Sequence, residues 1–230
     1  YALFTHQPII TLLAIHLAFV NWRLLQAPPE PHTRPPEPTA WRGTPGGRLG
    51  TIPSVPPTTK QVAFVMIASW AFLMLSAVIA AQPWALQMYK ALMLSPDRWL
   101  SEPWTAFTYL WLHDVHSMGH VAMNTLGFVF LGAILEPRWG RRDFLKFFLV
   151  SGVISGAITA GLGLLFPDAF GTPVVGASGG VFALLTALGL VMPDREVQLF
   201  FTWRLKLKHC VLGAIACDTL YFVATPDSDI

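Results

Sequence analysis

The stretch QVAFVMIASWAFLMLSAVIAA, residues 61–81, carries no charged residue over 21 positions. A helix of roughly 20 apolar residues crosses the ~30 Å hydrocarbon core of a bilayer, so we predict a transmembrane helix here. The rest of the chain agrees: 53% of its 230 residues are hydrophobic, 12% are charged, and the mean hydropathy is +0.52. Soluble domains carry roughly 25% charged residues. The composition therefore predicts an all-α polytopic membrane protein.

Other apolar stretches lie on both sides of this one. They are Ala2–Trp22, His120–Leu135, Phe144–Phe166, Ser178–Met192 and Leu207–Val223. Residues 26–60 hold ten of the nineteen prolines, which exclude a helix interior, so we expect an extended linker there. Residues 82–119 are rich in Trp and Tyr, which concentrate at membrane interfaces, so this segment is expected to lie half in the interface.

Basic residues lie in alternate connections between these stretches. Most of the Lys and Arg fall in residues 23–60, 136–146 and 193–208, whereas residues 167–177 have none. The positive-inside rule then places the basic connections in the cytoplasm, and residues 82–119 and Ser178 on the other side. The sequence has no basic patch interleaved with aromatic residues, so we expect no nucleic-acid partner.

The two cysteines, Cys210 and Cys217, lie on one apolar stretch, seven residues apart. Seven residues are two helical turns, a separation too large for a mutual disulfide. We interpret both as small, buried apolar residues.

Polar residues inside a membrane are candidates for function, and three stand out: His120, Asn124 and Ser178. The first two are spaced i, i+4 and share a helix face. Ser178 follows Gly176 at the junction of a loop and an apolar stretch, where the first N–H groups of a helix favour an oxyanion. The predicted topology places all three at a similar depth. This arrangement suits acyl transfer, with Ser178 as nucleophile and the other two as donors.

The same stretch has a second interpretation, which is close packing of helices. Gly179, Ala183 and Ala187 are small residues at a spacing of four, typical of helices that approach closely. On this motif alone packing is favoured over catalysis. Gly152 and Gly156 form another such pair, and packing accounts for them fully.

Taken together, these residues resemble the rhomboid family of intramembrane serine proteases. The resemblance runs from about Trp104 to Ile230. It rests on H-x-x-x-N at His120 and Asn124, on E-x-R-x-G at Glu136, Arg138 and Gly140, and on G-x-S-G at Gly176, Ser178 and Gly179. It implies a rhomboid-like helical bundle that needs no cofactor.

The resemblance also implies roles for these residues. Ser178 would be the nucleophile, and His120, Asn124 and the Ser178 N–H would form the oxyanion hole. Glu136 and Arg138 would tie together the loop between the first two core helices. The family's general base is a histidine on a sixth core helix, but His209 is the only histidine after Ser178. We expect His209 at the opposite membrane interface, so the polypeptide as given would be inactive.

This resemblance sets the expected organisation. Residues 1–25 would be an extra N-terminal transmembrane helix, residues 26–60 a linker, and residues 61–230 a rhomboid-like domain with five core helices that ends before the sixth. Its partners would be transmembrane protein substrates and lipid, and its location a bacterial inner membrane. The alternative function is a catalytically inactive rhomboid-like protein that binds transmembrane helices or serves as a subunit of a membrane complex.

Two further ideas concern histidines. Four potential metal ligands lie close together in the sequence: His113, Asp114, His116 and His120. No H-E-x-x-H pattern accompanies them, so we predict no metal site. His113 or His116 would instead be an extra histidine that rhomboids often carry before H-x-x-x-N. His16 loosely resembles the pigment-binding histidine of bacterial antenna polypeptides; a histidine satisfied by a neighbouring helix is the favoured interpretation.

Overall fold

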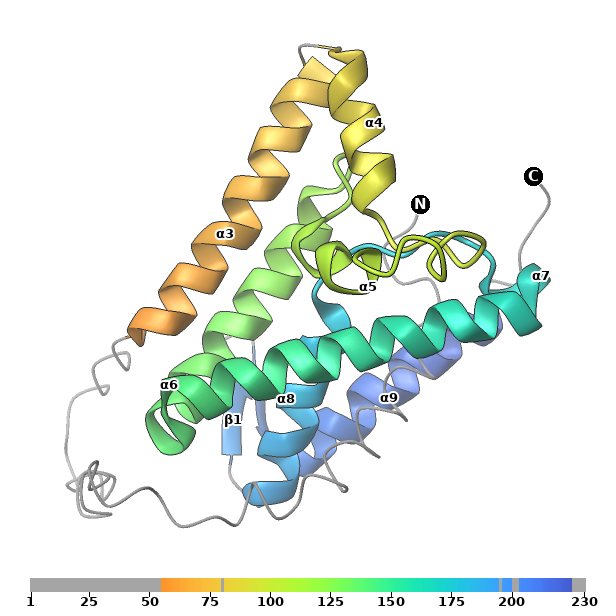
Figure 1. Ribbon diagram of the computed structural model, residues 1–230. Coiled ribbons are helices and arrows are strands. Elements are labelled where there is room, and N and C mark those ends of the chain that lie inside the picture. Colours follow the sequence, from red (N-terminus) through yellow and green to blue (C-terminus); the bar gives the residue numbers. More distant parts are fainter. Residues whose placement is uncertain (1–54, 80, 195, 200–202, 225–230) are drawn as a thin grey trace.

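A computed structural model describes residues 55–79, 81–194, 196–199 and 203–224, and this part of the chain is mostly helical (Figure 1). The stretch Ala2–Trp22, with His16, lies outside the described residues, as does nearly all of the expected linker. Two of the described helical segments, Pro57–Val78 and Met118–Leu165, are long and apolar enough to cross a membrane.

The first described helix, α3, spans Pro57–Leu73 and continues as the π-helical segment η2, Met74–Ile79. It covers most of the predicted span 61–81 but begins at Pro57, inside the expected linker. A proline at the first helical position is favourable because its φ is already helical and it has no N–H left to satisfy. The boundary predicted at residue 61 is therefore corrected to residue 57.

Helix α6, Met118–Leu165, unites the two predicted stretches 120–135 and 144–166. Its 48 residues are not straight, because Gly140 has φ 78° and ψ 160°, outside helical geometry. Only glycine adopts such a φ without steric cost. Figure 1 shows the result: two arms that run in different directions from a sharp turn. We call residues 118–137 the first arm and residues 141–165 the second arm.

Helix α8, Ser178–Val191, packs against α6 and forms the centre of the bundle. Ala183, Leu184, Ala187 and Leu188 of α8 are fully buried in one cluster with Phe128, Phe144 and Phe148 of α6. The helices approach closely, since a Cβ built on Gly180 would lie 2.6 Å from the Phe148 ring. The predicted small-residue face of α8 is thus buried inside the described bundle.

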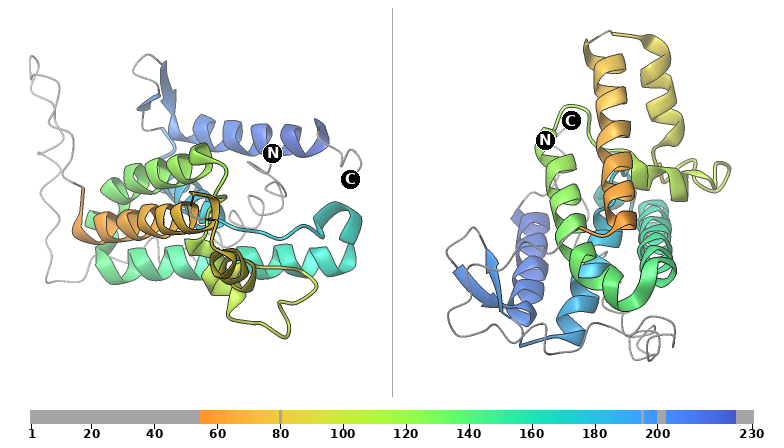
Figure 2. Two further views of the ribbon diagram at one scale, coloured as in Figure 1. Left: turned by 90° about the horizontal axis from the view of Figure 1, so that it is seen from above. Right: turned by 90° about the vertical axis from the view of Figure 1, so that its left-hand side faces the viewer.

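Helix α9, Leu207–Ala224, lies beside α8 (Figures 1 and 2). A Cβ on Gly189 would lie 2.5 Å from a methyl group of Val211, so the two helices touch near the C-terminal end of α8. Between them is an antiparallel hairpin that the sequence analysis missed, β1 (Glu196–Leu199) and β2 (Trp203–Lys206). The carboxylate of Asp194 pairs there with Lys208 at 2.8 Å and Lys206 at 3.5 Å.

The aromatic segment between α3 and α6, residues 82–119, was expected to lie half in the membrane interface. It is not a plain loop, because it contains short helical segments. Helix α4 spans Pro83–Leu92, α5 spans Thr105–Thr108, and the 3₁₀ segment η3 spans Tyr109–Trp111. A further short helix, α7 (Pro167–Phe170), precedes α8. Trp84 and Trp104 are 48% and 53% exposed, and their interfacial position stays a prediction.

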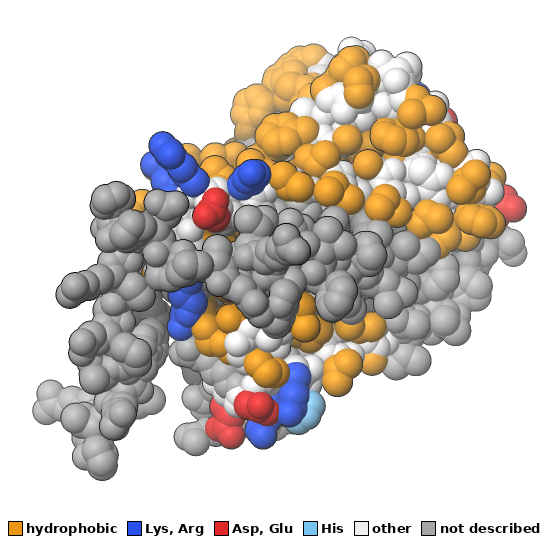
Figure 3. Space-filling view, turned by 60° about the horizontal axis from the view of Figure 1, so that its bottom comes forward, with side chains coloured by type: hydrophobic (Ala, Val, Ile, Leu, Met, Phe, Trp, Pro, Cys, Tyr) orange, Lys and Arg blue, Asp and Glu red, His pale blue; other side chains and the backbone are white. Residues whose placement is uncertain are grey.

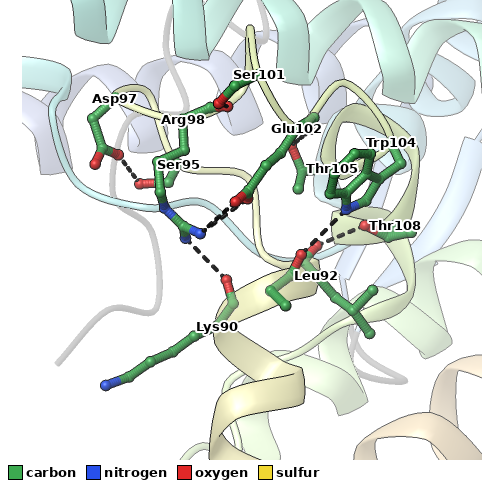
Figure 4. Close-up of polar contacts among 11 residues, drawn as sticks. Lys90, Leu92, Ser95, Asp97, Arg98, Ser101, Glu102, Trp104, Thr105 and Thr108 are labelled. Atoms are coloured by element: carbon green, nitrogen blue, oxygen red, sulfur yellow. Dashed lines mark hydrogen bonds and ion pairs between the residues drawn. The ribbon is translucent and has the colours of Figure 1, made fainter.

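Side chains hold this segment in place by capping the C-terminus of α4 (Figure 4). Arg98 donates to the carbonyl of Lys90, Trp104 donates to that of Ala91, and Thr108 donates to that of Leu92. The last carbonyls of a helix have no partner within the helix, so these bonds satisfy them. The segment that follows α4 is thereby fixed on the helix end.

Candidate functional site

Ser178 is the first residue of α8, and a glycine turn sets its position. Gly176 has φ +114°, a conformation that L side chains rarely adopt, and its N–H donates to the carbonyl of Tyr109 at 2.9 Å. The chain can therefore turn sharply into α8 at this point. Ser178 is half-buried at the positive end of the helix.

His120 and Asn124 lie on the first two turns of α6, and both side chains are buried. Asn124 Nδ2 donates to the His120 carbonyl at 2.9 Å. A Cβ built on Gly176 would lie 2.7 Å from His120 Nε2 and 3.9 Å from Asn124 Nδ2. Both side chains therefore meet the turn two residues before Ser178.

The contact between the two helices continues one turn further along each of them. A Cβ on Gly127 of α6 would lie 3.0 Å from a methyl group of Val181 of α8. Gly127 is three residues after Asn124, and Val181 is three residues after Ser178. The structure thus places His120 and Asn124 beside the turn that leads into Ser178, at one end of the α6–α8 contact.

The hydrogen bonds of His120 indicate which ring nitrogen carries the proton. The backbone N–H of Asp114 donates to Nδ1 at 3.4 Å, so Nδ1 acts as the acceptor. In a neutral imidazole the other nitrogen is then the donor. Nε2, the atom that faces Gly176, therefore carries the N–H. The site presents an imidazole N–H and a carboxamide toward the residues that lead into Ser178.

Tyr109 is a residue of this site that the sequence analysis missed. Besides accepting from Gly176, it donates its hydroxyl to the carbonyl of Gly152 at 2.6 Å. A Cβ on Gly156 would lie 2.5 Å from its ring, and one on Gly152 would lie 2.5 Å from Leu110. The pair Gly152 and Gly156 does serve close packing, as predicted, and its partner is η3.

A second backbone contact fixes the same turn. Leu94 and Val174 exchange N–H···O bonds of 3.1 and 2.8 Å. The segment after α4 and the segment before α8 are therefore joined by a short antiparallel bridge. With Tyr109, this bridge holds the approach to Ser178 on the part of the chain that caps α4.

Comparison with known protein families identifies the Rhomboid domain over residues 100–228, more than half of the 230-residue chain. The chain belongs to the rhomboid family. Neither the search of curated proteins nor the search of solved structures returned a match. The family, together with the two helical segments apt to cross a bilayer, makes this rhomboid an integral membrane protein.

Glu136 caps the start of α3 in this rhomboid. Its carboxylate accepts from the backbone N–H groups of Thr58 and Thr59, at 3.1 and 2.8 Å, and from the Thr59 hydroxyl at 2.7 Å. Arg138 donates to the carbonyl of Ile134, one turn back in α6. The expected role of Glu136 and Arg138 in tying together the loop between α3 and α6 stays a prediction.

His209 lies where the sequence analysis expected it, away from Ser178. It is exposed in the first turn of α9, and the adjacent Lys208 N–H donates to the Pro193 carbonyl, just past the C-terminal end of α8. Ser178 is at the other end of that helix, and 14 residues of helix measure roughly 21 Å. His209 is therefore out of reach of the Ser178 hydroxyl.

The histidines before α6 separate into two environments. His113 is fully buried, with its ring edge-to-face against His120 at a centroid distance of 5.3 Å, whereas His116 is exposed. Across the residues that the structure describes, no three His, Cys, Asp or Glu side chains are grouped so as to hold a metal ion.

Proposed function

We propose that this rhomboid is an intramembrane serine protease that cleaves transmembrane segments of membrane proteins. The observation that carries the proposal is the position of His120 Nε2 and Asn124 Nδ2 beside Gly176, two residues before Ser178. Ser178 would attack the scissile carbonyl, the amine would leave, and water would hydrolyse the acyl-enzyme.

The roles of the donors follow from the same geometry. The His120 Nε2–H, the Asn124 amide and the Ser178 backbone N–H would donate to the oxyanion that forms when Ser178 attacks. Removing one such donor from an acyl-transfer enzyme typically slows turnover by about 10²–10³-fold. The Ser178 proton would pass to a general base other than His209, because His209 lies roughly a helix length away.

The membrane gives the proposed substrate its geometry. His120 and Asn124 lie in the first two turns of the first arm, and in our proposal this end of the arm lies near one face of the membrane. A scissile bond would therefore be near the end of a substrate's transmembrane segment. The basic connections favour the face opposite the cytoplasm, and a bacterial inner membrane is the location we propose.

Cleavage by the full-length gene product tests the proposal. The protein is reconstituted in liposomes with a model transmembrane substrate, and cleavage is followed by mass spectrometry of the products. Full-length protein should cleave, Ser178→Ala should not, and Ser101→Ala, a change of an exposed serine outside the site, should cleave normally. Equal cleavage by full-length protein and Ser178→Ala would rule the proposal out.

The same experiment distinguishes the alternative, a rhomboid that binds transmembrane helices without cleaving them. In that case neither the full-length protein nor Ser178→Ala yields products. Both variants would still be crosslinked to the substrate helix to the same extent.

A further inference from the structure

His113 is a buried histidine that the proposed chemistry does not use. Its side chain has no exposed surface. Neither ring nitrogen makes a hydrogen bond of good geometry among the described residues, although the backbone of Trp111 lies close enough to oppose the lowering of the His113 pKa. A poorly paired buried polar group costs free energy, so the stability of the fold alone does not explain this histidine.

The neighbour of His113 supplies another reason. Its ring meets the ring of His120 edge-to-face, with centroids 5.3 Å apart and planes inclined by 67°. This is a preferred geometry for two aromatic rings. The His120 ring also meets Gly176 through Nε2 and the Asp114 N–H through Nδ1. His113 therefore forms one of three contacts that fix the orientation of this ring.

The loop that carries His113 is anchored on both sides of it. Ser69 Oγ donates to the carbonyl of Trp111 at 2.6 Å, and Trp70 Nε1 donates to the carbonyl of Asp114 at 3.0 Å. Both donors lie on α3, which is itself capped by Glu136. The loop cannot shift along α3 without breaking these bonds, so His113 is held rigidly against His120.

We propose that His113 is a positioning residue for His120, whose ring contact keeps Nε2–H directed at the turn before Ser178. This inference rests on the proposed function, in which that N–H stabilises the oxyanion. It assigns the effect to the aromatic ring of His113 as a packing surface and not to its nitrogens.

The charge state of His113 agrees with a role in which its ring only packs against His120. Burial, with a smaller contribution from the neighbouring His120, lowers the pKa of His113 to about 3. The ring is then neutral over the whole physiological range and neither carries a charge nor exchanges a proton there.

Two variants of the full-length protein separate the aromatic face from the nitrogens. His113→Ala removes both, whereas His113→Phe keeps an aromatic face without any nitrogen. In the liposome cleavage assay we expect His113→Ala to lower kcat about 10–100-fold with KM changed less than about 3-fold, because a small misplacement of a transition-state donor affects turnover. His113→Phe should restore kcat to within about 5-fold of wild type. His116→Ala, the exposed histidine of the same loop, is the matched control and should match wild type.

A spectroscopic measurement tests the positioning without relying on cleavage. In ¹⁵N-histidine-labelled full-length protein in detergent, the two-bond ¹⁵N–¹H correlations report which nitrogen of His120 is protonated. The signal is assigned by its loss in His120→Gln. We expect Nε2–H in wild type and in His113→Phe at pH 7.5, and a mixture of tautomers in His113→Ala.

The cleavage and tautomer measurements together distinguish three outcomes. If wild-type His120 is protonated on Nδ1, or if His113→Ala keeps both wild-type kcat and the Nε2–H tautomer, the positioning role is refuted. If His113→Phe loses as much kcat as His113→Ala while keeping its fold, the nitrogens act and the inference is also refuted. If wild type shows Nε2–H and His113→Ala shows the mixture, but no protein cleaves, the proposed function fails and the positioning of His120 stands.

Discussion

In the candidate site the backbone of Gly176 lies against the ring of His120. The glycine is required there for two independent reasons: its φ of +114° and the 2.7 Å that would separate a Cβ from Nε2. The motif G-x-S-G predicted a tight turn, since glycine permits positive φ. It gave no sign that the space left by the missing side chain is taken by His120, 56 positions earlier in the chain.

Gly176→Ala should therefore disable the site while only moderately weakening the fold. We expect cleavage by the full-length protein to fall at least about 100-fold, because the new methyl group displaces the donor on His120. The free energy of unfolding should drop by about 1–3 kcal/mol because of the strained backbone.

The matched control is Gly161→Ala in the second arm of α6, where a Cβ would meet no atom within 4 Å. Its helix should gain ~0.5–1 kcal/mol, and its cleavage should be unchanged. Wild-type cleavage by Gly176→Ala would show that the approach to His120 does not matter.

His113 makes the stability of the protein depend on pH in a definite direction. Its pKa is about 3 in the folded state, against about 6.5 for an unperturbed histidine. Between these values the unfolded state binds more protons, so stability falls as pH falls through this window and is fully present above pH ~6.5. At pH 5 the loss should approach ~2 kcal/mol.

His113→Phe has no such group and should lose less stability on acidification. Thermal unfolding in detergent at pH 7.5 and pH 5.0, followed by tryptophan fluorescence, measures the difference between the two proteins. All other residues are the same in the two proteins, so the difference between them is assigned to His113. Equal shifts in wild type and His113→Phe would show that His113 is not buried as a neutral ring.

At the scale of elements, α3 depends on α6 for its N-terminal cap. Pro56, the residue before α3, provides no side-chain hydrogen bond, and the carboxylate of Glu136 takes the N–H groups of Thr58 and Thr59 instead. An acid at a helix N-terminus also interacts favourably with the helix dipole. The sequence marked Glu136 by its motif, but its partners lie more than 75 positions away, and sequence spacing does not reveal such a pair.

Glu136→Gln should destabilise the bundle by about 1–3 kcal/mol, because hydrogen bonds to a charged acceptor are stronger than bonds to a neutral one. The control is Asp143→Asn, an exposed acid on the same helix, which should change the unfolding midpoint little. Denaturation in detergent with increasing SDS measures both. A Glu136→Gln midpoint equal to that of Asp143→Asn would contradict the capping role.

At the scale of the whole molecule, broad hydrophobic surfaces face outward, and charged side chains gather at the margins of the visible face (Figure 3). Exposed apolar side chains include Phe64, Phe72, Leu126, Phe130 and Leu164. Such a surface suits lipid contact, because a soluble protein rarely exposes large apolar patches. Apolar stretches in the sequence predicted the helices well, since the bilayer requires both length and hydrophobicity.

Other features of the whole molecule were not predictable from those stretches. The hairpin β1–β2 lies in a basic connection whose apolar residues are too few to indicate strands. Helix α4 has only ten residues and is surrounded by prolines and aromatic residues, so its sequence did not indicate a helix. The E-x-R-x-G motif pointed to a turn at Gly140. The apolar stretches on both sides of Gly140 gave no indication of the angle between the two arms of α6. The position of His120 and Asn124 beside the turn before Ser178 was predictable, because alternating crossings lead these residues to be expected at one depth. The contacts by which Tyr109 and Leu94 hold the approach to Ser178 were not, because they are made by backbone groups.

The predicted orientation is testable with single cysteines in a protein whose Cys210 and Cys217 are replaced by alanine. Ser101 and Arg142 are exposed in connections assigned to opposite faces. A membrane-impermeant maleimide added to intact cells should label Ser101→Cys, whereas Arg142→Cys should require permeabilisation. The reverse pattern would invert the topology and place Ser178 near the cytoplasm.

The central claim is that Ser178 is a nucleophile activated at the α6–α8 contact. The most direct measurement treats the full-length protein in detergent with a fluorophosphonate and maps the modified residue by peptide mass spectrometry. The account predicts one adduct on Ser178, absent in Ser178→Ala and at least about 10-fold slower in His120→Ala, which lacks an oxyanion donor. An adduct on another residue, or substrate cleavage that continues in Ser178→Ala, would contradict it.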